Sequence, residues 1–127
     1  MLEVLPERFA IAKLQADSEV PAWVQGGPLV SVTRTPAELS IVCAEASVPL
    51  DVNAERALRC LRIVGPLAFS EIGVLSSLTQ PLARAGVSIF ALSTYDTDYL
   101  LLAHAELEAS LVALNEAGHV VRRLGAA

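Results

Sequence analysis

Residues 86–104 read GVSIFALSTYDTDYLLLAH, and this stretch decides the fold. The apolar run from Val87 to Leu92 is rich in Val, Ile and Phe, as is typical of a buried strand. A second apolar run extends from Asp98 to His104. The polar residues between the runs fit a tight turn, because Ser and Asp side chains hydrogen-bond to nearby backbone. The stretch therefore predicts a β-hairpin whose turn carries polar groups that need water, one another or a ligand.

The segments on either side of this hairpin extend it to a complete motif. Residues 71–85 carry apolar side chains at the three-to-four spacing of a half-buried helix, with Ser70 as a suitable N-cap. Residues 106–117 repeat that spacing after the hairpin. Strands are expected at 59–64 and 119–124. The resulting β-α-β-β-α-β order is the ferredoxin-like arrangement, so the fold class is α+β.

The first half of the chain predicts a similar unit with almost no helix. Strands are expected at 8–15, 29–35 and 39–44, and residues 54–57 fit a short helical turn. We therefore divide the chain into two units, residues 1–58 and 59–127, with the first a degenerate copy of the second. The first unit needs a closing strand and the second unit needs an opening strand at the same place in the chain. Only the strand at 59–64 lies there. How the first unit completes its sheet is left open.

Composition narrows the functional classes. The chain has 127 residues, is 54% hydrophobic and carries a net charge of −5 without a basic cluster, which argues against a nucleic-acid partner. Its apolar runs are far shorter than the roughly 20 residues of a membrane span, and its first residues lack a secretion signal, so we expect a cytoplasmic protein without a membrane partner. So apolar a chain predicts a subunit interface, most simply a homodimer.

Catalysis and metal binding have no support in the sequence. Cys43 and Cys60 lie in apolar runs without metal-ligand spacing, and His104 and His119 have no second ligand at a suitable distance along the chain. There is no nucleophile–base pair and no cofactor-binding loop. We therefore expect no catalytic residue, no metal ligand, no cofactor and no enzymatic activity.

The segments SVTRTPAELSIVC (31–43) and GPLAFSEIGVLSSLTQPLARAGVSIFALSTYDTDYLLL (65–102) resemble the small tandem ACT-domain proteins. The same signature occurs in the CASTOR-type arginine sensors and, more distantly, in the regulatory domains of aspartate kinases. The resemblance spans residues 9–124. It implies tandem ferredoxin-like ACT units, with 1–58 the degenerate ACT-like unit and 59–127 the ACT domain. Those sensors have four ACT units in one chain and this protein has two, so a comparable seam needs a second subunit.

The resemblance also implies a ligand site at a seam between ACT units. Positions that match the family's site lie on a strand, on the hairpin and in the loop that leads into the first helix: Ser88, Ile89, Thr94, Tyr95, Asp98, Glu71 and Gly73. Backbone N–H groups at residues 70–73 suit a carboxylate. Asp98, with carbonyls of Ser88, Ile89, Thr94 and Tyr95, suits an ammonium group. These residues can equally serve as local caps and turn carboxylates, and that alternative stays open.

The expected function is a non-catalytic regulatory module that binds an amino acid or a similar small ligand at an ACT–ACT interface. The alternative is a structural or adaptor ACT protein that oligomerises or docks a partner enzyme or regulator without a small ligand. The polar groups of the hairpin favour the first function, and the high apolar fraction favours the second.

Overall fold

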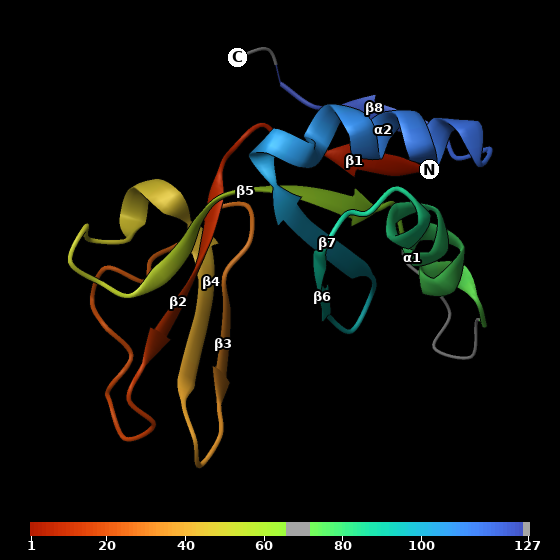
Figure 1. Ribbon diagram of the computed structural model, residues 1–127. Helices are drawn as coiled ribbons and strands as arrows, with labels where there is room; N and C mark the ends of the chain where they lie inside the picture. The colour runs from red at the N-terminus through yellow and green to blue at the C-terminus, as the bar shows by residue number, and fades with distance from the viewer. Residues whose placement is uncertain (66–71, 126–127) are drawn as a thin grey trace. The chain divides into compact units, whose positions relative to one another are not determined.

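The computed structural model describes residues 1–65 and 72–125 (Figure 1). Within them the chain forms two compact units: an N-terminal unit, Glu7–Leu58, and a C-terminal unit that combines Met1–Pro6 with Arg59–Ala127. The elements in chain order are β1 (Leu2–Val4), β2 (Phe9–Leu14), β3 (Ser31–Arg34), β4 (Leu39–Ala44), η1 (Glu45–Ser47), β5 (Ala54–Ile63), α1 (Val74–Arg84), β6 (Ile89–Ser93), β7 (Asp98–Ala103), η2 (His104–Glu106), α2 (Leu107–Glu116) and β8 (Val121–Arg123).

The C-terminal unit has the expected β-α-β-β-α-β order, in β5, α1, β6, β7, α2 and β8. Its strands lie side by side in the order β8-β1-β5-β7-β6. Alternate residues of β7, Leu100 and Leu102, are buried in one core with Leu78 and Leu82 of α1 and Leu114 of α2. Both helices therefore bury their apolar faces in the core of this sheet, as the α+β fold class requires.

Strand β1 is an addition that the sequence did not predict. It lies between β5, to which it is antiparallel, and β8, to which it is parallel. Residues 1–6 thus belong to the unit formed by 59–127, whereas the sequence-based division placed them with residues 7–58. The sequence does not predict this strand, because its three residues, Leu2, Glu3 and Val4, are too few to show the alternating hydrophobic pattern of a strand.

The N-terminal unit has the strand order β3-β4-β2-β5, entirely antiparallel. This is the strand order of a ferredoxin-like unit, but residues 7–58 contain only the short η1 and no α-helix, as expected for a degenerate copy. The helical turn expected at 54–57 is wrong, because these residues begin β5. Ala57 has a φ of 55°, beside a shift in the pairing of β2 with β5. Strand β5 supplies its first half to this unit and its second half to the other, which completes both sheets.

Candidate functional site

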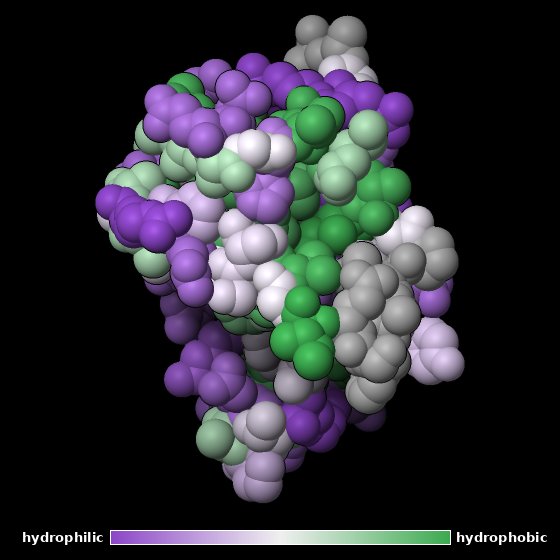
Figure 2. Space-filling view, turned by 90° about the vertical axis from the view of Figure 1, so that its right-hand side faces the viewer, coloured by the Kyte–Doolittle hydropathy of each residue, from purple (hydrophilic) through white to green (hydrophobic). Residues whose placement is uncertain are grey.

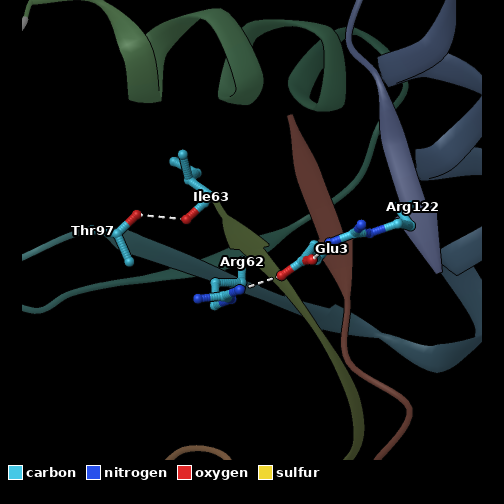
Figure 3. Close-up of polar contacts among 5 residues, drawn as sticks. All are labelled: Glu3, Arg62, Ile63, Thr97 and Arg122. Carbon is cyan, nitrogen blue, oxygen red and sulfur yellow. Dashed lines mark hydrogen bonds and ion pairs between the residues drawn. The ribbon is translucent and has the colours of Figure 1, made fainter. Parts of the chain in front are cut away.

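The turn between β6 and β7 is fixed to the end of β5. The buried hydroxyl of Thr97 donates a hydrogen bond of 2.7 Å to the carbonyl of Ile63, the last residue of β5 (Figure 3). The turn is closed by Thr94, whose N–H donates to the carbonyl of Thr97 over 2.8 Å. The polar hairpin turn therefore lies at the end of the sheet from which the chain continues toward α1.

Asp98, Thr94 and Tyr95 all belong to this turn, so the structure brings three of the seven expected site residues together. Asp98 is half-buried at the start of β7, and its Oδ1 accepts a hydrogen bond from the hydroxyl of Ser93, its neighbour on β6. That bond is what a turn carboxylate makes, and it engages one of the two carboxylate oxygens. Tyr95 is 96% exposed, so its ring is open to a ligand or a second molecule.

Gly73 is the residue that starts α1. Its φ of 81° lies in the left-handed region, which favours glycine, and its carbonyl accepts the first bond of the helix from the N–H of Ser77 over 2.9 Å. No side chain caps this helix end among the described residues. The helix begins later than predicted, and the expected Ser70 cap and Glu71 lie outside the described residues. Gly73 and the next residues therefore present backbone N–H groups at the positive end of the helix dipole.

Ser88 and Ile89 are at the opposite end of β6 from Asp98. Ile89 pairs with Leu102 and Ser93 pairs with Asp98, so the length of β6 separates the two places. Four residues of strand span about 13 Å. Within one chain, Asp98 and the carbonyls of Ser88 and Ile89 cannot hold the same ammonium group. Among the described residues β6 pairs only with β7, which leaves its outer edge open.

The conformation of Gly73 gives a direct test of the start of α1. We expect Gly73→Ala to lower the free energy of unfolding by about 1–2 kcal/mol, because a Cβ is disfavoured at a left-handed φ. Gly26→Ala is the matched control, since a Cβ there meets nothing within 4 Å and Gly26 is not in the left-handed region. Urea unfolding of both variants measures the difference. Equal stability of the two would contradict the described start of α1.

A second polar cluster, Glu3 with Arg62 and Arg122, was not foreseen in the sequence. These residues are direct neighbours on β1, β5 and β8, and each arginine donates to a different carboxylate oxygen of Glu3 (Figure 3). The side chain of Glu3 is only 4% exposed. The hydrogen bonds from Arg122 and Arg62 lower the pKa of the Glu3 carboxyl, although its burial acts in the opposite direction. The cluster links β1 to its two neighbouring strands.

Both cysteines are buried in the protein. Cys43 is buried in the core of the N-terminal unit, and burial raises the pKa of its thiol. Cys60 is also buried. In the described segments, no three His, Cys, Asp or Glu residues are grouped so as to hold a metal ion. The same segments contain no helix of the length and apolarity needed to cross a membrane.

The C-terminal unit is an α+β domain with a polar hairpin turn at one end of its sheet. The ACT domain family model matches residues 53–116, and the chain belongs to this family. A separate family model, for an N-terminal domain, matches residues 7–51. No curated protein matches the chain.

Several solved structures are similar to this chain. A crystal structure of a protein from Agobacterium tumefaciens is 40% identical, with a TM-score of 0.92, and the match covers 98% of this chain and 93% of that one. A Vibrio cholerae protein described as a possible transport protein has a TM-score of 0.75 at 14% identity, covering 93% and 89% of the two chains. The ligand-free regulatory subunit of aspartate kinase from Thermus thermophilus has a TM-score of 0.60 at 12% identity, covering 89% and 94%. The last two likenesses concern the fold alone.

Proposed function

We propose that this protein is a non-catalytic, cytoplasmic regulatory module that binds an amino acid at a seam between the ACT units of two subunits. The observation that carries the proposal is the hydrogen bond between Thr97 and Ile63, which fixes the polar turn to the end of β5 that leads toward α1. Membership of the ACT family and the structural likeness to an aspartate kinase regulatory subunit support a regulatory role.

The two ends of an amino acid need opposite partners. The backbone N–H groups that begin α1 at Gly73 suit a carboxylate, because a helix N-terminus is positively polarised. Asp98 is half-buried and suits the ammonium group through a charge-assisted hydrogen bond. Thr94 contributes a carbonyl at the same turn, and the exposed ring of Tyr95 can cover the ligand. Glu71, which lies outside the described residues, remains part of the proposed site.

A homodimer completes the site. If the open edges of two β6 strands pair antiparallel about a twofold axis, the start of one strand lies beside the end of the other. Ile89 of one subunit then lies about one strand spacing of 4.8 Å from Ser93 of the other and about two spacings from Asp98. These distances are shorter than the length of β6 that separates the same residues within one chain.

The dimer can be broken by a charge on this edge. Phe90 of β6 is 39% exposed, and we expect Phe90→Lys to give a monomer of 13.4 kDa, because a lysine on an edge strand opposes pairing. Val32 is 43% exposed on the edge strand β3. Val32→Lys is therefore the matched control, and we expect it to remain a dimer. Light scattering measures both masses. A parent protein that is monomeric at micromolar concentration would contradict the proposal.

The alternative function, an adaptor that docks a partner enzyme, has one observation in its favour. Figure 2 shows apolar side chains gathered on the side of the molecule that carries α1 and the start of β1. Met1 and Val120 are each more than 60% exposed, and both neighbour Leu2, whose N–H donates to the carbonyl of Val120. Such a surface suits a protein partner.

A thermal-shift titration with each of the twenty amino acids separates the two functions. A ligand that binds only the folded state must raise the melting temperature. We expect at least one amino acid to do so. If none does, and the protein instead associates with a partner enzyme through the apolar surface, the adaptor function is the correct one.

A further inference from the structure

A small pocket lies at the end of the C-terminal unit's sheet that is remote from the polar turn. It has a volume of 280 Å³ and forms where β1 and β8 end, with the N–H of Leu124 donating to the carbonyl of Val4 over 2.9 Å. Its lining residues are Val4, Pro6, Arg59, Arg123, Leu124 and Gly125. Arg59 and Ile63 lie at opposite ends of the half of β5 in this unit, so the pocket is separate from the proposed amino-acid site.

Arg59 contributes a guanidinium group to this pocket. Its Nη2 donates to the carbonyl of Leu5 over 3.2 Å, and its Nη1 lies 3.4 Å from Nδ1 of His104. Its Nε is buried and has no hydrogen-bond partner in the described parts of the chain. This nitrogen is enclosed by the protein, so it does not reach a bound molecule. Each Nη nitrogen carries two N–H groups, so beyond its contacts with Leu5 and His104 the guanidinium has further donors for an acceptor of another molecule.

Arg123 adds a second guanidinium to the same pocket. Its Nη2 pairs with Glu108 of α2, but the two side chains are 53% and 75% exposed. Exposed ion pairs contribute little to stability, so Arg123 can exchange this partner for a competing anion at small cost. Together Arg59, Arg123 and Glu108 leave an excess of one positive charge in a chain whose net charge is −5.

We propose that this pocket binds a small oxyanion, either the carboxylate of a short organic acid or inorganic phosphate. The guanidinium group recognises both, since its planar donors match two oxygens of one anion. The volume is below the roughly 300 Å³ at which pockets for drug-sized ligands begin, which limits the ligand to a small anion. The apolar side chains of Pro6 and Leu124, which also line the pocket, can contact the short carbon chain of an organic acid.

The test is an NMR titration of the full chain with malonate and, separately, with inorganic phosphate at constant ionic strength. We expect saturable, millimolar binding that shifts the amide signals of Leu124 and Gly125. Stronger binding of malonate identifies a carboxylate ligand, and stronger binding of phosphate identifies a phosphate ligand. Absence of saturable shifts at these two residues with either anion would overturn the proposal.

Substitution of Arg59 tests its role. We expect Arg59→Met to weaken anion binding at least about tenfold, because a charged hydrogen-bond donor is lost. Arg84→Met is the matched control, since Arg84 carries the same charge but lines a different surface hollow between α1 and α2. If Arg59→Met fails to fold, Arg59→Lys keeps the charge without the planar guanidinium and should weaken binding in the same direction. Unchanged affinity in a folded Arg59 variant would also overturn the proposal.

Discussion

Replacement of Glu3 by glutamine is expected to lower the melting temperature by at least about 5 °C at neutral pH, because two arginines lose their shared charged acceptor, whose side chain is only 4% exposed. Glu3 lies on β1, between β5 and β8, and is the shared acceptor of Arg62 on β5 and Arg122 on β8. Without its negative charge, the two guanidinium groups repel one another across the strand that separates them.

The effect of Glu3 depends on pH in a defined direction. The pKa of its carboxyl is lower in the folded protein than in the unfolded chain, chiefly because Arg122 and Arg62 donate hydrogen bonds to the ionised form. Its contribution to stability is therefore complete above the unfolded pKa of about 4.3 and is lost as the pH falls through the folded pKa. The difference in melting temperature between parent and Glu3→Gln should shrink as the pH is lowered from neutral to below about 4.3.

Glu108→Gln is the control for this prediction. Glu108 also pairs with an arginine, Arg123, but the carboxylate side chain is 75% exposed. An exposed pair contributes about 0–1 kcal/mol, so this variant should melt close to the parent temperature. If calorimetry shows the two variants equally stable, the Glu3 cluster does not hold β1 in the sheet.

Replacement of Asp98 by alanine is expected to weaken amino-acid binding at least about thirtyfold, because the ligand's ammonium group loses its ionic partner. The fold should persist, since Asp98 lies at a hairpin end and its hydrogen bond from Ser93 is near the surface. Isothermal titration calorimetry with the amino acid that raises the melting temperature measures the loss.

Asp96→Ala provides the matched control for Asp98. Asp96 is exposed on the same turn and carries the same charge, but it is not part of the proposed site. We expect its removal to change the affinity by less than about tenfold, as for a rim charge whose effect is screened by salt. Equal affinity of Asp98→Ala and the parent would place the ligand elsewhere.

The sequence predicted the elements whose pattern is long and regular. The hairpin around residues 94–97, strand β4 and both helices of the C-terminal unit occur where their apolar periodicity indicated. Strand β1 could not be predicted, because three residues show no period and Glu3 is an unfavourable residue for a buried strand. The alanine and charged residues at 54–57 predict a helical turn, whereas pairing with β2 makes these residues part of a strand.

For the candidate site, the sequence predicted the chemistry of the turn better than its geometry. Thr94, Tyr95 and Asp98 lie together because they are close in the chain. Nothing in the sequence indicated that Ser88 and Asp98 are at opposite ends of β6, since that follows from strand direction and register. The Glu3 cluster and the pocket at Arg59 join residues from distant parts of the chain, and only the sheet order brings them together.

The most direct test of the central claim is to map the amino acid onto the protein by amide NMR. With the amino acid that raises the melting temperature, we predict saturable shifts at Gly73 and Ser76, at residues 94–98 and at Ser88 and Ile89. The shifts at the start of β6 are expected because a second subunit completes the site. Shifts confined to other parts of the chain, or no response to any of the twenty amino acids, would contradict an amino-acid site at the seam between two ACT units.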